Sequence, residues 1–442
     1  MQKQETVQLK REVGVWGLSL NAINLTIGAG IFILPAIVAE KLGPASFIAY
    51  LFCAILIILI MLCFAEVGSK VTTSGGAYAY VDAAFGPLIG FIINTLFWLG
   101  YSILADAAIA NALFDLIKDF HPLFQYSFSK GLFILFLYGL FAFVNIVGVK
   151  SGIRFVMVTT IVKMVPLVLI IVIGLFHISK QNIVVHSIPE FKTIGETSLI
   201  LLFAFFGAET ALSISGEIKN PNKTIPKAIF ISISTVVLIY LLTQFVAQGV
   251  LGKDLLNHQA APLIALAVKI VGPIGSVIIL IASFVSMFSL LSGDVLATSR
   301  VLFAASEKKL LPVYLSKLHP KFATPYISIL FFSFLTVLVA VSGSFTSLAI
   351  LSSSSILIIF LAVVLATIKL RFTKSSTQLS TFKIPFGLTI PLLSIAVIIW
   401  FLSNLKFDEF KALIIFIVLT IIFYFFNKII QKRVTIKQKN SH

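Results

Sequence analysis

Charged side chains are scarce in this chain of 442 residues. Asp, Glu, Lys and Arg make up only 11% of it, whereas hydrophobic residues make up 59%. The mean hydropathy of +1.08 lies far outside the range of soluble domains. The shortage of charge excludes a separate soluble domain and indicates an integral membrane protein.

Cysteine and histidine are also few. The two cysteines, Cys53 and Cys63, lie in one apolar stretch, which is typical of buried helix residues and excludes a disulfide framework. The six histidines fall mostly in expected loops without metal-ligand spacing. The chain also has no nucleophile–base pair and no phosphate-binding Gly-Lys-Ser/Thr motif. We therefore expect neither an enzyme nor a metal or cofactor site.

Long apolar runs dominate what is present. A membrane-spanning helix needs about 20 mostly apolar residues, and the sequence predicts an all-α protein with twelve such helices. A further apolar run, 261–268, is too short to span, so we expect it to lie across the outer mouth of the bundle. The predicted spans cover residues 13–39, 45–65, 87–117, 132–149, 153–176, 195–218, 225–251, 274–305, 326–341, 348–370, 384–402 and 413–429.

In a soluble protein, the net charge of +16 would suggest binding to nucleic acid. In a membrane protein, the distribution of the charge over the loops is more informative because it indicates the orientation of the chain. If both termini are cytoplasmic, most of the 33 Lys and Arg residues fall on the inner side, as the positive-inside rule requires. We therefore expect a multi-pass protein of the cytoplasmic membrane, with cytoplasmic tails at 1–12 and 431–442 and no nucleic-acid partner. The basic segment 428–439 would lie near anionic lipid headgroups of the bilayer, and the oligomeric state stays open.

Two predicted spans are interrupted by glycine. The first contains Gly28-Ala-Gly30, and the sixth contains Gly207 and the carboxylate of Glu209. Glycine permits backbone torsions that a regular helix does not use, and unwound backbone at membrane depth survives only where it is packed in protein or lines a cavity. The two spans therefore predict broken helices that face a substrate site. Close helix packing is the alternative explanation for the glycines of the first span.

Lys163 is the least expected residue, because it lies near the middle of the fifth span. A central lysine opposes membrane insertion by about 2.5–3.5 kcal/mol, so it must face the bundle interior. Burial disfavours the ammonium form, and such a lysine could carry a proton through a transport cycle. Alternatively, a permanently charged Lys163 could hold helices together by bonding to carbonyls at a helix break.

Other polar residues lie in the third and eighth spans. Ser102 and Asp106 lie in the third, where a buried acid is a candidate functional group, although a hydrogen bond to a neighbouring helix would also explain Asp106. In the eighth, serines three residues apart form a polar stripe that either faces a lysine or serves helix packing, and Asp294 follows them. The stripe comprises Ser283, Ser286, Ser289 and Ser292.

The order of the spans suggests an internal repeat. Five spans precede the loop 181–192 and five follow it, so the two sets have opposite orientations, and each begins with a glycine-interrupted helix. Paired broken helices are the best sequence pointer to the substrate site of an inverted-repeat transporter. We expect one membrane domain over 1–442, with repeats at 13–180 and 193–371 and two additional helices within 384–430.

A series of short motifs extends in order from about residue 14 to residue 320. They are 28–32 (Gly-Ala-Gly-Ile-Phe), 73–78 (Thr-Ser-Gly-Gly-Ala-Tyr), 205–209 (Phe-Phe-Gly-Ala-Glu), 217–221 (Glu-Ile-Lys-Asn-Pro), 225–228 (Ile-Pro-Lys-Ala), 300–304 (Arg-Val-Leu-Phe-Ala) and 311–312 (Leu-Pro). In identity and order these motifs resemble the signatures of the amino acid, polyamine and organocation (APC) superfamily of permeases, in particular its proton-coupled amino acid transporters.

The resemblance implies a twelve-helix LeuT-type fold, with a 5+5 inverted repeat and broken first and sixth helices, that moves an amino acid or amine by alternating access. The substrate carboxylate would bind free amides after the first break, and its amino group would bind carbonyls at both breaks. Helix ends suit these roles, because an N-terminal end offers free N–H donors and a C-terminal end offers free carbonyls. The implied residues are the donors Ala29, Gly30 and Ile31, the acceptors Thr26, Phe203 and Phe206, and the break glycines Gly28, Gly30 and Gly207.

The resemblance also implies a mechanism of coupling. Lys163 would take the place that sodium occupies in relatives, between the first and eighth spans and next to Ser289, so that a proton gradient drives uptake. Phe203 would act as an aromatic gate, and the third span near Ser102 would line the side-chain pocket. Because Glu209 is shared with exchangers of basic amino acids and amines, an antiporter that uses Glu209 and Asp106 is the alternative. A permease-like sensor or subunit is a more distant one.

Overall fold

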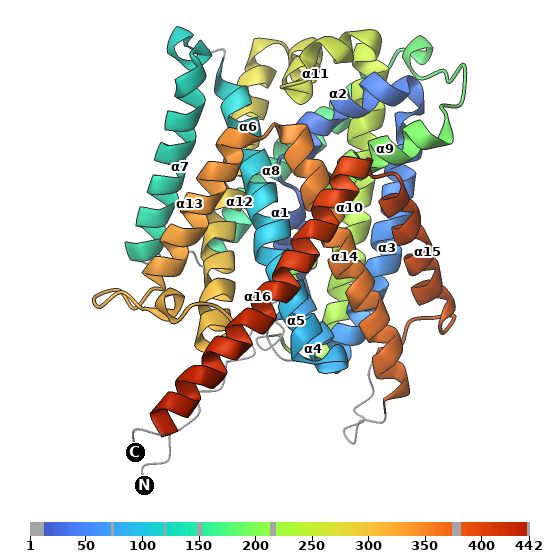
Figure 1. Cartoon of the computed structure of the whole chain (residues 1–442). Coiled ribbons are helices and arrows are strands. Elements are labelled where there is room, and N and C mark those ends of the chain that lie inside the picture. The colour runs from blue at the N-terminus through green and yellow to red at the C-terminus, as the bar shows by residue number, and fades with distance from the viewer. Residues whose placement is uncertain are drawn as a thin grey trace.

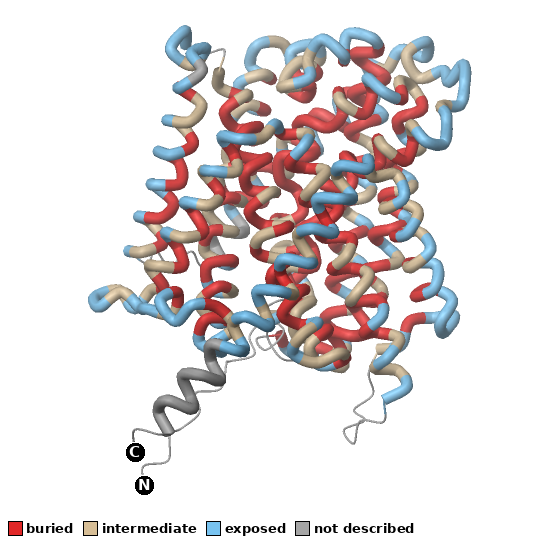
Figure 2. The backbone as a smooth tube through the Cα atoms, in the orientation of Figure 1, coloured by how far each residue is buried: buried red, intermediate tan, exposed pale blue. Residues whose placement is uncertain are grey.

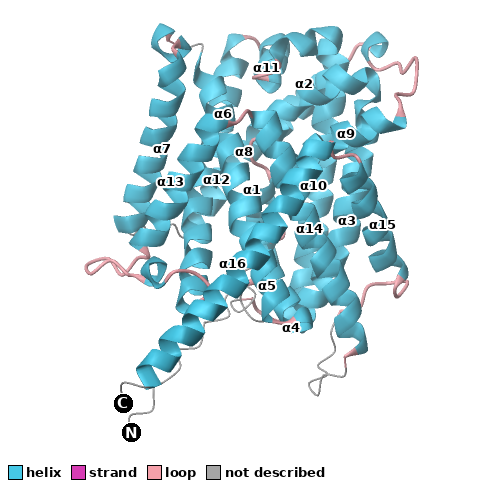
Figure 3. Cartoon of the chain, viewed as in Figure 1, coloured by secondary structure: helices cyan, strands magenta, loops and turns pink. Residues whose placement is uncertain are grey.

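The computed structural model describes residues 13–71, 75–118, 121–147, 153–212, 218–373 and 382–439. Within these ranges the chain is helical (Figure 3), and the β contact found there is a single bridge between Val13 and Ile218. Residues 72–74 and 217 of the sequence motifs, the tail 1–12 and the end of the other tail, 440–442, lie outside the described residues.

The first predicted span consists of two helices. α1 (Val15–Thr26) ends where Ile27 leaves the helical path with ψ of 86°, and α2 (Gly30–Leu42) begins three residues later. The sixth predicted span is also interrupted, because α9 (Phe191–Leu202) tightens into the turn Phe203–Phe205 and Phe206 is extended. The sequence predicted that this span continues to residue 218, but only turns and a short 3-10 segment follow as far as Leu212.

The remaining helices build a bundle around these two interruptions (Figure 1). α11 lies at one end of the bundle and α4 at the other, while α15 and α16 lie along its outside. The third predicted span is divided into α5, a π-helical segment η2 and α6. The bounds are α3 (Ser46–Lys70), α4 (Gly76–Phe85), α5 (Pro87–Thr95), η2 (Leu96–Ile103), α6 (Leu104–Ile117), α7 (Ser127–Val147), α8 (Ile153–Gly174), α10 (Pro221–Leu251), α11 (Pro262–Val271), α12 (Pro273–Glu307), α13 (Tyr326–Ser342), α14 (Phe345–Phe372), α15 (Thr389–Ser403) and α16 (Phe407–Lys439).

Nine helical segments of the described residues are long and apolar enough to cross a membrane, and α11, α13 and α15 are shorter apolar helices. The predicted all-α, multi-pass membrane architecture is therefore confirmed. The count of twelve spans stays a prediction, because α13 and α15 have only 17 and 15 residues and α1 is half of an interrupted span.

Apolar side chains cover the outside of the bundle as well as its interior. Figure 2 shows buried residues on the inner helices and exposed residues along the periphery. Large apolar side chains such as Phe136, Ile274 and Phe372 are 69%, 71% and 72% exposed. Soluble proteins rarely expose apolar surface on this scale, whereas lipid solvates it. Within the bundle, α10 packs against α1 and α3, and α12 packs against α6 and α8, so these helices surround the first break.

An ion network ties the end of α3 to the end of α14. Glu66 is fully buried, and its two carboxylate oxygens accept hydrogen bonds from the Arg371 guanidinium, with Nε at 2.7 Å from Oε1. The Lys70 ammonium lies 3.0 Å from Oε1, and the Ile384 backbone N–H donates to Oε2 at 3.0 Å. Two cations and a backbone donor thus satisfy this acid, so we assign it a structural role.

Candidate functional site

The two interrupted helices meet at the centre of the bundle through their backbones. A Cβ on Gly30 would lie 2.7 Å from the Cα of Ala204, and a Cβ on Gly207 would lie 2.3 Å from the carbonyl oxygen of Leu25. Gly207 also has φ of +122°, a conformation that favours glycine. Both glycines are therefore needed for the close approach of one break to the other.

Each kind of helix end is present at this junction. α2 starts with no side chain capping its first amides, so these donors are free of the usual cap. α1 ends beside them at Thr26, where helix-end carbonyls carry partial negative charge. The junction can therefore bind an anionic group and a cationic group at the same time.

A small cavity of about 50 Å³ lies at the junction. A single water needs about 10–15 Å³ on this scale, so the cavity holds only a few water-sized groups. Four of the predicted residues do not line it: Ile31 is buried in the apolar core, Glu209 faces another cavity, and Lys163 and Ser289 lie outside its wall. The predicted residues that line it are Thr26, Gly28, Ala29, Gly30, Ser102, Asp106, Phe203, Phe206 and Gly207.

Tyr240 of α10 lies between the two breaks. Its hydroxyl lies 3.1 Å from the carbonyl oxygen of Thr26 and 2.8 Å from that of Ala204. The side chain is fully buried, and its ring packs edge-on against Phe205 at a centroid distance of 5.0 Å. One side chain therefore contacts a carbonyl of each broken helix.

Lys163 lies beside the first break. It is fully buried, and its Nζ donates to the carbonyl oxygens of Asn24 and Ile27, both at 2.7 Å. No carboxylate of the described residues forms an ion pair with it. Its ammonium is thus held by the partial negative charge at the end of α1, in the interior position that the sequence required.

The serine stripe of α12 reaches the same carbonyl. The Ser286 hydroxyl donates to the carbonyl oxygen of Ile27 at 3.0 Å, whereas the Ser289 hydroxyl donates to the Ser286 carbonyl of its own helix at 3.1 Å. The residue that shares an acceptor with Lys163 is therefore Ser286 rather than the expected Ser289. The reason is the rotation of α12, which directs Ser286 toward the break.

Glu209 folds back onto its own break. Both of its carboxylate oxygens lie 3.0 Å from the backbone nitrogen of Gly207, and the Thr210 hydroxyl donates to the carbonyl oxygen of Gly207. The Tyr101 side chain, from η2, interacts with the same carboxylate. Glu209 therefore holds the irregular backbone of the second break in shape.

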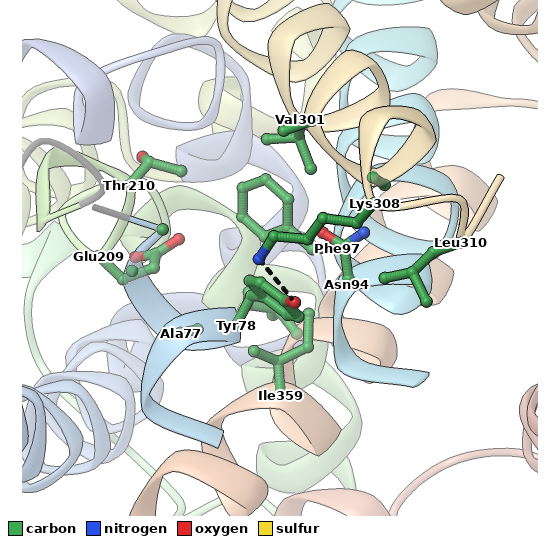
Figure 4. A pocket seen from close by; sticks show the side chains of 15 residues that line it. Ala77, Tyr78, Asn94, Phe97, Glu209, Thr210, Val301, Lys308, Leu310 and Ile359 are labelled. Atoms are coloured by element: carbon green, nitrogen blue, oxygen red, sulfur yellow. Dashed lines mark hydrogen bonds between the residues drawn. The ribbon is translucent and has the colours of Figure 1, made fainter. Parts of the chain in front are cut away.

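A larger cavity of about 310 Å³ begins at Glu209 and Thr210 (Figure 4). Lys308 extends across it, and its Nζ donates to the Tyr78 hydroxyl at 3.3 Å and lies 5.1 Å from the centroid of the Tyr78 ring. Thr210 lines both cavities. The larger cavity therefore approaches the small one from the end of the bundle at which α4 lies.

Asp106 of α6 and Asp294 of α12 both line the small cavity. The Thr298 hydroxyl lies 3.2 Å from Asp294 Oδ1 and 3.2 Å from the Ser102 hydroxyl, which links α12 to η2. The described residues contain no group of three or more His, Cys, Asp and Glu that could hold a metal ion.

The sequence does not point to Tyr240, and it indicates Tyr101 only as a neighbour of Ser102 in the third span, not as a partner of Glu209. A tyrosine in an apolar helix is unremarkable, and the partners of both hydroxyls come from distant parts of the chain. The one available signal was general: a phenol hydroxyl placed in a membrane span needs a hydrogen-bond partner inside the protein.

A helical membrane bundle with two facing helix breaks, an uncapped helix start and a buried lysine has the architecture of a membrane transport protein. Residues 13–429 match the family described as "Amino acid permease", and the chain belongs to that family. The predicted resemblance to the APC superfamily is thereby confirmed, and so is the expectation that the protein is a transporter and not an enzyme.

Three bacterial relatives cover nearly the whole chain, all from Bacillus subtilis (strain 168). The serine/threonine exchanger SteT is 30% identical over 404 residues, which is 88% of this chain and 89% of that protein. The branched-chain amino acid permease BcaP is 28% identical over 434 residues, 94% of this chain and 93% of that protein. A methylthioribose transporter is 26% identical over 448 residues, 96% of this chain and 94% of that protein.

Proposed function

We propose that this protein takes up an amino acid across the cytoplasmic membrane by alternating access, coupled to the inward movement of protons. The observation that carries the proposal is the contact of the Lys163 ammonium with the carbonyls of Asn24 and Ile27, at the break that frees the start of α2. A proton can shift a conformational equilibrium only if it interacts differently with the two states. These contacts supply that difference, because they strengthen when Lys163 is charged.

The substrate binds across the two breaks. Its carboxylate meets the amides of Ala29, Gly30 and Ile31, and its ammonium meets the carbonyls of Thr26, Phe203 and Phe206. Two observations support this placement: the start of α2 has no side-chain cap, and the small cavity lies between the breaks. The printed names of SteT and BcaP, which refer to amino acids, support the substrate class.

Phe203 and Glu209 control access to the bound substrate. The Phe203 ring lines the small cavity and packs edge-on against Phe345 at a centroid distance of 5.6 Å, so its rotation would open or cover the site. Glu209 faces the larger cavity while it holds the Gly207 amide, so its release would accompany movement of the second break.

The architecture that fits this cycle is a single membrane domain of twelve spans with both termini cytoplasmic. Residues 13–180 and 193–371 form the two inverted repeats of a LeuT-type fold, and the helices within 384–430 are additions. The matching positions of the two broken helices and the positive-inside distribution of Lys and Arg support it. The larger cavity then opens to the cytoplasm, and the proton gradient supplies the energy without a cofactor.

Exchange of one amino acid for another is the second candidate. It is favoured by one observation, the 30% identity to a protein named as a serine/threonine exchanger. An exchanger needs internal substrate and has no need for a proton-carrying Lys163.

Uptake into proteoliposomes of the full-length protein tests the proposal. Wild-type uptake should rise with an inward proton gradient, and Lys163→Ala should abolish that rise because it removes the proposed proton carrier. Lys118→Ala is the matched control, since Lys118 lies at the surface and pairs with Asp115. Uptake that requires internal amino acid and is unaffected by Lys163→Ala would instead establish exchange. Saturable binding without flux would indicate a sensor.

A further inference from the structure

Two acids in the wall of the small cavity have no role in binding the backbone groups of an amino acid. Asp106 is 1% exposed, Asp294 is partly buried, and both line the cavity together with the two helix breaks. Their carboxyl groups interact with each other. Helices α6 and α12, which are distant in the chain, thus place a pair of acids at one point of the site.

The pair has few partners within the protein. Asp294 Oδ1 accepts a hydrogen bond from Thr298, but Asp106 Oδ2 is buried and has no hydrogen-bond partner among the described residues. The buried Tyr138 hydroxyl interacts with the Asp106 carboxyl but lies outside hydrogen-bonding geometry to it. No ion pair of the described residues involves either acid, and the Lys163 ammonium is directed at backbone carbonyls.

Two carboxyl groups in this position need a positive partner. Like charges in close contact at a buried site cannot both be ionised, and an unpaired charge within a membrane span is costly. A proton shared by the two acids is one solution. A ligand ammonium is a stronger one, because it can donate charge-assisted hydrogen bonds to both carboxylates at once.

We propose that Asp106 and Asp294 form the subsite for the substrate side chain and select side chains that end in an ammonium group, which makes short diamino acids the preferred substrates. This inference rests on the proposed function: the helix breaks hold the α-carboxylate and α-ammonium groups, and the two acids receive the second ammonium. The cavity volume of about 50 Å³ limits the length of the side chain. Thr298, in contact with both Ser102 and Asp294, holds the second acid in position.

Binding of matched amino acids to the purified full-length protein tests the subsite. The pairs are 2,4-diaminobutyrate with norvaline and ornithine with norleucine, whose members differ only by ammonium in place of methyl; serine is a small reference. We expect the ammonium member to bind about tenfold or more tightly, as close charge pairs in buried sites do. Asp106→Asn and Asp294→Asn should each bring that ratio toward one. Asp115→Asn, at an exposed position of the same helix α6, should leave it unchanged.

Each other outcome counts against a specific claim. Equal binding within the pairs, tighter binding of the neutral member, or binding of serine alone overturns the subsite but not the proposed function, and indicates that the two acids share a proton. An unchanged ratio in both Asn variants overturns the assignment to these acids. Folded wild-type protein that binds none of the five amino acids overturns the proposed function and the subsite together. The wild-type comparison decides even if the variants fail to fold.

Discussion

Glu66 and Lys163 are both fully buried charged residues, but they are stabilised in different ways. Glu66 accepts hydrogen bonds from Arg371 of α14, from Lys70 of its own helix α3 and from the backbone N–H of Ile384. Among the described residues, the Lys163 ammonium donates to backbone carbonyls, and those belong to an interrupted helix. The first arrangement is complete and holds helices together. The second depends on an irregular backbone segment whose carbonyls are outside the regular helical pattern.

The largest effect on stability is expected from the Glu66 network. Arg371→Ala leaves a buried carboxylate without its bidentate partner, and breaking a buried pair in this way costs about 3–5 kcal/mol. The expected result is a large fall in the thermal unfolding temperature of the purified protein, with little change in proton coupling of the fraction that folds.

Lys369→Ala is the control for this change, because Lys369 is an exposed residue of the same helix that contacts only the ring of Phe85 among the described interactions. The double variant Glu66→Gln with Arg371→Met removes both charges and should recover part of the lost stability. If Arg371→Ala melts at the wild-type temperature, the network is not structural and the contrast with Lys163 fails.

The second effect concerns the break itself. Gly207→Ala places a methyl group 2.3 Å from the Leu25 carbonyl oxygen at a backbone φ of +122°, so overpacking and backbone strain together cost about 2–4 kcal/mol. We expect transport to be lost even where the protein still folds. Gly139→Ala on α7, where the new methyl group meets nothing within 4 Å, should leave transport unchanged and slightly raise stability. If the Gly207→Ala variant transports substrate at the wild-type rate, the two breaks need not be in contact.

The smallest effect is expected at Tyr240. Tyr240→Phe keeps the buried ring and removes the hydroxyl that contacts Thr26 and Ala204, and the loss of these buried hydrogen bonds costs about 1–2 kcal/mol. Melting temperature should fall slightly, while substrate affinity and uptake rate should change more. Tyr314→Phe is the control, because it makes the same change at a tyrosine that is exposed at the surface. If Tyr240→Phe and Tyr314→Phe lose the same amount of substrate affinity and uptake, the claim that Tyr240 links the two breaks is wrong.

The interrupted helices and the interior position of Lys163 could be predicted from the sequence. Glycines and a lysine inside apolar runs are visible without any knowledge of folding, because a lipid environment makes each of them costly. The contacts among Tyr240, Ser286 and the first break could not be predicted, since they join residues more than 200 positions apart through the rotation of α10 and α12. The resemblance implies Ser289 as the neighbour of Lys163, and a helical stripe alone does not say which serine faces the break.

Local irregularity was also beyond the sequence pattern. The third span reads as one apolar helix, yet the π-helical η2 changes its register just where Tyr101 and Ser102 approach the cavity. The sixth span is predicted to reach residue 218, but turns and a short 3-10 segment lead from Phe206 to Leu212, and the Glu209 carboxylate accepts from the Gly207 N–H. In both cases tertiary contacts outweigh the apolar pattern, and the departures lie at the candidate site.

The Tyr240 hydroxyl carries one proton but faces two carbonyl oxygens. At any moment this hydroxyl can donate to the first broken helix or to the second, and the Thr26 oxygen also accepts from the Gly28 N–H at 2.9 Å. In the proposed binding mode, a substrate ammonium at Thr26 would replace the phenol as a donor to that oxygen, which would leave the phenol proton to Ala204. Rotation of a single O–H bond would then communicate occupancy of the first broken helix to the second.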